Sequence, residues 1–148
     1  MPSKIYTIKR FLQGIALLHI VAGICFPLIV KSPSFGFYHE HLNQSFGIIN
    51  ENNGQQTLFL ISIFGPTIAS WGVLFLYIVN SAFSRPNAQA WWFMFSACLV
   101  WAPYDSALSI LNGVYLNAVI NAIAFPVIVV PLLIAKSYFN PLPVSNPE

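Results

Sequence analysis

The chain has 148 residues, of which 57% are hydrophobic and only 7% are charged, and its formal net charge is +2 at pH 7. Soluble domains usually carry about 25% charged residues, so this composition excludes a water-soluble globular domain. The small net charge, without a basic patch or interleaved basic and aromatic residues, argues against nucleic-acid binding. We therefore expect a single integral membrane domain whose main partner is the lipid bilayer.

Four apolar segments are long enough to cross the hydrocarbon core as helices, which takes about 20 residues. Helices are required because a lone strand would leave its backbone groups unpaired in lipid, and the strict alternation of a membrane barrel is missing. The predicted fold class is an all-α membrane protein, an antiparallel bundle of four transmembrane helices within residues 1–136. The predicted spans cover residues 11–30, 57–80, 90–111 and 114–135.

The first span has the basic start of a secretory signal peptide. Its apolar stretch is long, however, and no Ala-x-Ala cleavage site follows it. The stretch "VAGIC" at 21–25 is similar to a lipoprotein signal, but Ile24 stands before Cys25 where a small residue is needed. We expect this segment to remain as a membrane span.

Five of the six basic residues fall on one side of the predicted threading, and Lys31 alone falls on the other. The five are Lys4, Lys9, Arg10, Arg85 and Lys136. Because loops rich in lysine and arginine stay in the cytoplasm, both termini are predicted to be cytoplasmic. The small size and the retained first span favour the plasma (inner) membrane.

A long connection, residues 31–56, joins the first two spans on the predicted outer side. Apolar residues recur there at offsets of three or four, namely Phe35, Tyr38, Leu42, Phe46 and Ile49. This pattern predicts an amphipathic helix over residues 36–50 that lies at the outer membrane interface, with Asn53-Gly54 as its stop. The alternative is an ordered loop that plugs the top of the bundle.

Asp105 is an acid placed inside the third apolar segment. At 1.5 Å per residue it lies roughly 22 Å from the cytoplasmic side, in the outer half of the span. A charge at mid-membrane costs about 2.5 kcal/mol or more, so such acids normally face the protein interior. We expect Asp105 to face inward with Asn117, Asn121 or His19 as its partner, either as a carboxylate or as a protonated acid bonded to an asparagine.

Further polar residues lie at similar depth, and two hypotheses account for them. In the first they only bond helices together, at about 0.6 kcal/mol per interhelical hydrogen bond. In the second they line an outward-facing pocket whose walls include aromatic side chains such as Tyr115. The candidate ligand-binding residues are Asp105, Ser109, Asn117, Asn121, His19, Trp101 and Tyr104.

The triplet His39-Glu40-His41 suggests a metal site, since imidazole and carboxylate groups bind zinc and copper. Residues two apart point away from each other on a helix, so we expect no metal there. No P-loop, nucleophile elbow or G-x-G-x-x-G motif occurs in the sequence, and no cofactor is expected. The proline-rich residues 137–148 are predicted to be disordered.

These observations favour a small multi-pass protein that binds a lipid-like or small amphipathic ligand, or a larger membrane partner, in a polar seam. One alternative is a dimeric transporter or channel subunit with Asp105 as a proton or cation site. Another is a membrane enzyme of lipid chemistry that uses Asp105 with a histidine. The sequence assigns no catalytic residue, and a homo-oligomer or a larger membrane complex is compatible with it.

Overall fold

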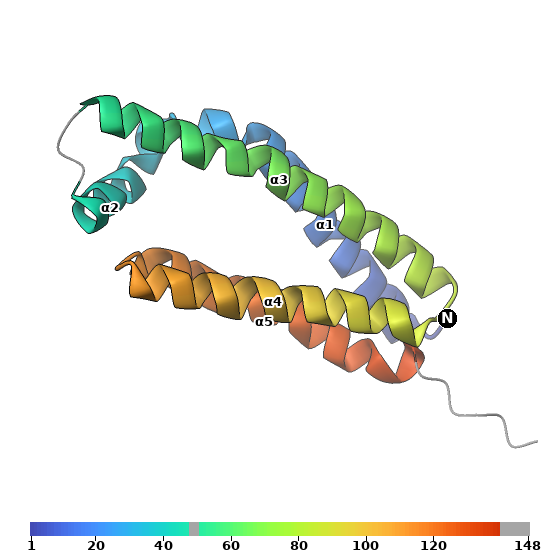
Figure 1. The fold of residues 1–148 in the computed structure, drawn as a ribbon. Helices are drawn as coiled ribbons and strands as arrows, with labels where there is room; N and C mark the ends of the chain where they lie inside the picture. The colour runs from blue at the N-terminus through green and yellow to red at the C-terminus, as the bar shows by residue number, and fades with distance from the viewer. Residues whose placement is uncertain (48–50, 140–148) are drawn as a thin grey trace, which may run out of the picture.

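A computed structural model describes residues 1–47 and 51–139 of the chain, and within them every regular element is a helix (Figure 1). The elements are α1 (Ser3–Ile29), the short 3-10 helix η1 (Pro33–Phe35), α2 (Gly36–Phe46), α3 (Glu51–Ser84), α4 (Ala88–Leu111) and α5 (Tyr115–Phe139). Helices α1, α3, α4 and α5 are long and apolar enough to cross a membrane. The all-helical prediction is thus confirmed, and each predicted span lies almost wholly within one of these helices.

The long helices extend beyond the apolar segments that predicted them. Helix α1 begins at Ser3 and includes the basic N-terminal residues, and α3 begins six residues before the predicted span. Helix α5 continues to Phe139, whose buried ring packs against Phe83 at 4.9 Å between centroids. The first three residues of the predicted tail are therefore helical, and residues 140–148 lie outside the described residues.

The predicted stop of the amphipathic helix at Asn53-Gly54 is wrong, because these residues belong to α3. Helix α2 ends at Gly47, which adopts a left-handed conformation with φ of 62° and donates its N–H to the Asn43 carbonyl. Glycine accepts this conformation without steric cost and commonly ends a helix in this way. The last part of the predicted helix, residues 48–50, lies outside the described residues.

Helices α1 and α3 form one closely packed pair, the α1–α3 pair (Figure 1). Their contact is close because glycines face it: a side chain at Gly23 would collide with the backbone of Gly65 and Ala69. Further along, Gln13 of α1 donates to Asn80 of α3 at 2.5 Å. Small residues at a helix interface allow the two backbones to approach closely and so favour association in a membrane.

Helices α4 and α5 form the second pair, the α4–α5 pair, joined by a turn at Asn112–Val114. Gly113 in this turn has φ of 74°, which other residues rarely adopt. At the other end of the pair, the buried indole of Trp91 donates to the Leu132 carbonyl at 2.7 Å. The turn thus connects α4 and α5 at one end of the pair, and this hydrogen bond joins them near the other.

Among the residues that the structure describes, the buried core that the two pairs share lies at one end of the molecule. In α1 and α4 this core extends as far as Ala16 and Cys98, and in α3 and α5 it begins at Phe75 and Ile128. We call this the packed end; it also holds the N-terminus (Figure 1). Toward the opposite, open end the two pairs diverge, and α2 lies between them there (Figure 1).

Candidate functional site

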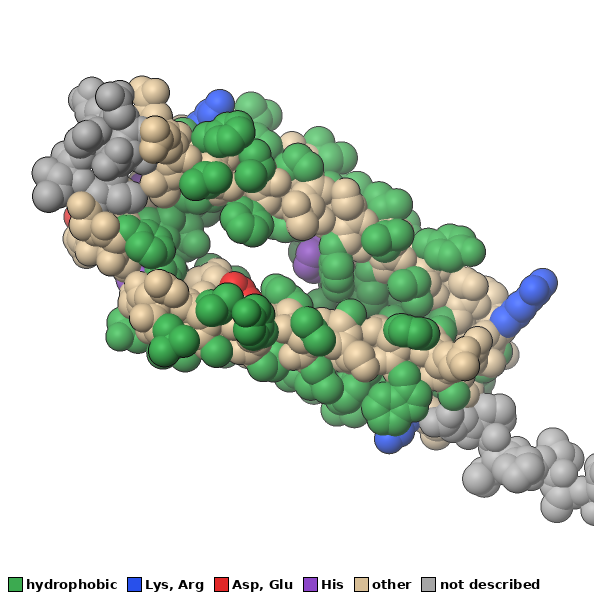
Figure 2. Space-filling model, viewed as in Figure 1, with side chains coloured by type: hydrophobic (Ala, Val, Ile, Leu, Met, Phe, Trp, Pro, Cys, Tyr) green, Lys and Arg blue, Asp and Glu red, His purple; other side chains and the backbone are tan. Residues whose placement is uncertain are grey.

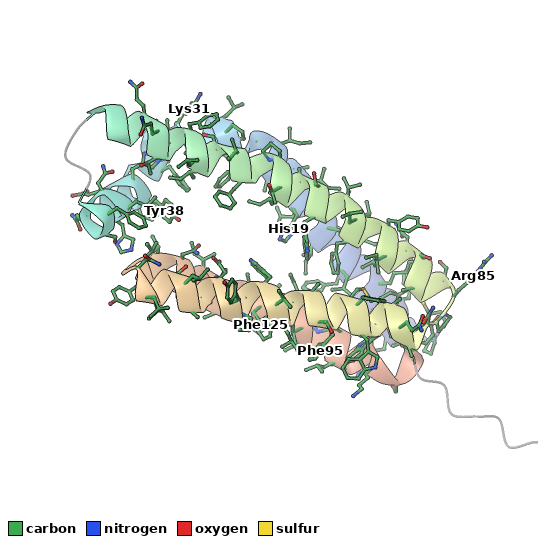
Figure 3. All side chains as sticks on the ribbon, in the orientation of Figure 1. His19, Lys31, Tyr38, Arg85, Phe95 and Phe125 are labelled. Atoms are coloured by element: carbon green, nitrogen blue, oxygen red, sulfur yellow. The ribbon has the colours of Figure 1, made fainter. Side chains whose placement is uncertain are left out.

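The divergence of the pairs leaves an opening through the molecule (Figure 2). An acidic side chain borders it on the α4–α5 side, and a histidine borders it on the α1–α3 side (Figure 2). Asp105 is the one acid of α4 and α5, and His19 is the one histidine of α1 and α3. Figure 3 places His19 at the edge of the same space. His19 thus borders the opening, and the charge of Asp105 acts on Tyr38, which Figure 3 shows on the other side of the same space.

Asp105 belongs to a hydrogen-bonded group on the facing sides of α4 and α5, which we call the polar cluster. The Asn121 amide donates to Asp105 Oδ2 at 2.6 Å and to Ser106 Oγ at 3.2 Å. The Asn117 amide donates to Asp105 Oδ2 at 3.1 Å and to Ser109 Oγ at 2.8 Å. The predicted pairing of Asp105 with Asn117 and Asn121 is confirmed.

The cluster follows from helical spacing and the short turn. Asp105 and Ser109 are four residues apart on α4, as are Asn117 and Asn121 on α5, so each pair lies on one face of its helix. The turn at Gly113 folds α5 back on α4, and the two faces meet. Asn121 is only 4% exposed, which means that its polar atoms depend on these partners.

His19 is not a partner of Asp105, contrary to one of the three predicted pairings. Its ring Nδ1 donates to the Ile15 carbonyl at 2.8 Å, because a carbonyl oxygen can only accept. The hydrogen-bond partner of His19 is thus a carbonyl in the preceding turn of its own helix and not the Asp105 carboxylate. The imidazole packs on the Trp71 ring, with 4.7 Å between ring centroids.

Aromatic side chains close the opening on the side of the packed end. The Trp71 ring of α3 lies 6.5 Å from the Trp101 ring of α4, so the two indoles bridge the helix pairs. Trp71 also stacks on the buried Phe75 at 4.8 Å, where the shared core begins. Trp101 lies one helical turn before Asp105 on α4. We call this bridge of Trp71 and Trp101 the indole floor.

Helix α2 brings a tyrosine to the opposite side of the opening, where Figure 3 shows Tyr38. The single hydroxyl hydrogen of Ser45 is shared between the His41 carbonyl of its own helix at 2.9 Å and the Gly113 carbonyl at 3.2 Å, so α2 lies against the α4–α5 turn. Burial and, second, the negative charge of Asp105 raise the pKa of Tyr38 above its ordinary value of 10.0. Tyr38 therefore keeps its phenolic proton at neutral pH and lies within electrostatic reach of Asp105.

Not every predicted site residue lies in this arrangement. Tyr104 is 66% exposed, and Tyr115 at the start of α5 is also exposed, and neither belongs to the polar cluster. Their roles as pocket walls stay predictions. Sequence reasoning assigned no site role to Ser106, Tyr38 or Trp71. The apolar period of residues 35–49 placed Tyr38 on the face of α2 that packs inward, and this signal could have identified it.

A second space lies between α2 and the first turns of α3. It is a pocket of about 490 Å³ whose lining residues are His39, Leu42, Asn43, Gly54, Gln55, Thr57, Leu58 and Ile61. None of the polar cluster lines it. Among the described residues no three histidine, cysteine or acidic side chains lie close enough together to hold a metal ion.

No protein-family model matches the chain, and no curated protein or solved structure is significantly similar to it. The function is therefore inferred from the arrangement of the side chains.

Proposed function

We propose that the protein is a multi-pass membrane protein that binds an amphipathic, lipid-like molecule in the opening between its two helix pairs. The observation that carries the proposal is the position of the polar cluster. Asp105 and its two asparagines lie beyond the last residues of the shared core, and an acidic side chain borders the opening there (Figure 2). A space of this kind suits a ligand with a polar head and an apolar chain.

The proposed setting is a lipid bilayer crossed by an antiparallel bundle of α1, α3, α4 and α5. Large apolar side chains on the outer surface support it, for example Leu111, which is 82% exposed. Contiguous apolar surface of this extent is unfavourable in water and marks contact with a membrane or a partner. Lysine and arginine residues gather at the packed end, which we place with both termini on the cytoplasmic side of the plasma membrane.

The bound molecule would reach the opening sideways from the bilayer. Its chain would lie in the space above the indole floor, and its head would contact the polar cluster, with Tyr38 on the far side. Ligand sites in helical proteins typically combine apolar walls with a few polar groups that fix the orientation. Trp71, Trp101 and the polar cluster provide this combination.

Native mass spectrometry of the protein extracted in a mild detergent tests this proposal. We expect one lipid-sized molecule to stay bound to the wild-type protein and to be lost from Asp105→Leu, because the variant removes the polar contact for the head. Glu40→Gln is the matched control, since Glu40 is an exposed acid on α2 and its loss should leave the bound molecule in place. Wild-type protein that is free of any bound molecule would contradict the proposal.

A dimeric transporter or channel subunit is the second candidate, favoured by the isolated acid that faces the opening. It requires a dimer in the same mass spectra and uptake by reconstituted vesicles that Asp105→Asn abolishes. An enzyme of lipid chemistry would need a histidine beside Asp105, and His19 is instead bonded to Ile15. We therefore place the enzyme third.

A further inference from the structure

Among the described residues, the amide donors of the polar cluster are all engaged, whereas one carboxylate oxygen of Asp105 is not. An asparagine amide nitrogen carries two hydrogens. Asn117 directs its two donor contacts to Asp105 and Ser109, and Asn121 directs its two to Asp105 and Ser106. Both bonds to Asp105 reach Oδ2, and no described donor reaches Oδ1. The cluster therefore keeps the Oδ1 atom of Asp105 as a charged acceptor, beside the hydroxyl groups of Ser106 and Ser109.

Asp105 also has no cationic partner among the described residues. Its hydrogen bonds come from the neutral amides of Asn117 and Asn121. The charges of the packed end are engaged there: Lys9 donates to Ser84 at 3.4 Å, and Lys136 lies over the rings of Trp91 and Trp92 at 5.2 and 5.5 Å. A carboxylate away from bulk water without a counter-charge is costly, so a cation at Oδ1 would be stabilised.

Other side chains that border the opening also favour a cation. His19 donates from Nδ1 to Ile15, and in an uncharged imidazole the other ring nitrogen, Nε2, is an acceptor. The indole of Trp101 adds an aromatic ring, a group that attracts cations. Tyr38 can donate one hydrogen bond, but an anionic head would still meet the like charge of Asp105. Charge complementarity therefore selects against a phosphate or carboxylate head.

We infer that the opening binds an amphipathic organic cation, an alkyl chain with a protonated amine whose positive charge lies against Asp105. This inference rests on the proposed function and names the class of its ligand. It assigns the chain of the ligand to the space above the indole floor and the ammonium group to the acceptors of the polar cluster. The cation supplies the counter-charge that the described residues do not.

Dodecylamine and 1-dodecanol form a matched pair of probes for this inference. They share chain length and both donate hydrogen bonds, but the amine is protonated at pH 7.5 because alkyl amines titrate near pH 10. Binding of each is measured by titration of the protein in nanodiscs of zwitterionic phospholipid. We expect dodecylamine to bind at least tenfold more tightly than dodecanol, and Asp105→Asn to weaken the amine at least tenfold while leaving the alcohol unchanged.

Two further variants keep the result interpretable. Asp105→Glu retains the charge and should preserve the preference for the amine, which guards against a folding defect in Asp105→Asn. Glu40→Gln removes an exposed acid from α2 and should leave both affinities unchanged. Circular dichroism and size-exclusion profiles establish that each variant is folded.

The outcomes separate the inference from the function it rests on. Equal binding of amine and alcohol, both insensitive to Asp105→Asn, would overturn the cation inference and leave an amphiphile site. A preference for the amine that Asp105→Asn does not change would also overturn the inference, because the charge would act elsewhere. Saturable binding of neither probe, together with a wild-type protein that carries no bound molecule in native mass spectrometry, would overturn the proposed function as well.

Discussion

The Asn121 amide donates to Asp105 at 2.6 Å and joins α5 to α4 at the level where the two helix pairs have lost their common core. The bond holds the carboxylate within the α4–α5 pair and leaves its second oxygen without a described donor. Because the donor is neutral, the bond orients the charge without cancelling it. The same contact thus stabilises the fold and prepares the proposed ligand site.

Removal of this donor should weaken the α4–α5 pair. We expect Asn121→Ala to lower the free energy of unfolding by about 1–2 kcal/mol, between the mean for hydrogen bonds between membrane helices and that for bonds to charged groups. Unfolding in a detergent titration followed by circular dichroism measures the loss. Asn112→Ala is the control, because the exposed Asn112 bonds only its own helix at Leu108, and we expect a change below about 0.5 kcal/mol. Equal losses in both variants would show that the contact between α4 and α5 contributes nothing.

The contact of α1 with α3 should tolerate no side chain at its glycines. We expect Gly23→Ala to lower the free energy of unfolding by about 1–3 kcal/mol, since its methyl group would meet the backbone of α3. Gly14→Ala lies in the same helix with open space around it and should stabilise by up to about 1 kcal/mol through helix propensity. The same detergent titration compares the two variants. A neutral Gly23→Ala would mean that α1 and α3 are not in close contact.

Tyr38 should titrate above the ordinary value of its phenol. The difference in ultraviolet absorbance near 295 nm between wild type and Tyr38→Phe isolates its ionisation, which we expect above pH 10.0. In Asp105→Asn the pKa of Tyr38 should fall part of the way back, because burial is the larger cause and remains. The raised pKa stabilises the fold fully below pH 10, and this contribution is lost as the pH rises through the raised value. Titration of Tyr38 at or below pH 10.0 would place it away from Asp105 and in water.

The four long helices could be predicted from composition because about 20 consecutive apolar residues have few other stable arrangements. The Asp105 cluster could also be predicted, since a four-residue spacing on each helix and a turn at Gly113 bring the two polar faces together. Both features depend on local order along the chain. They require no knowledge of how one helix pair meets the other.

The opening could not be predicted for that reason. It exists because the buried cluster ends at Ala16, Phe75, Cys98 and Ile128, and which apolar residues face another helix pair instead of lipid is not readable from hydropathy. The pairing of His19 failed because a histidine in a helix can bond the carbonyl four residues before it. The end of α2 was misplaced because the apolar period continued past Gly47, where the left-handed turn ends the helix.

The central claim is that an amphiphile lies in the opening beside Asp105 and does not merely dissolve in the surrounding lipid. The most direct measurement is the set of nuclear Overhauser contacts between the chain protons of dodecylamine and the tryptophan indoles of the protein in deuterated nanodiscs. Trp71 and Trp101 form the floor of the opening, whereas Trp92 is exposed at the packed end. The account predicts contacts to Trp71 and Trp101 that disappear in Asp105→Asn. Contacts to Trp92 alone, unchanged by that substitution, would contradict it.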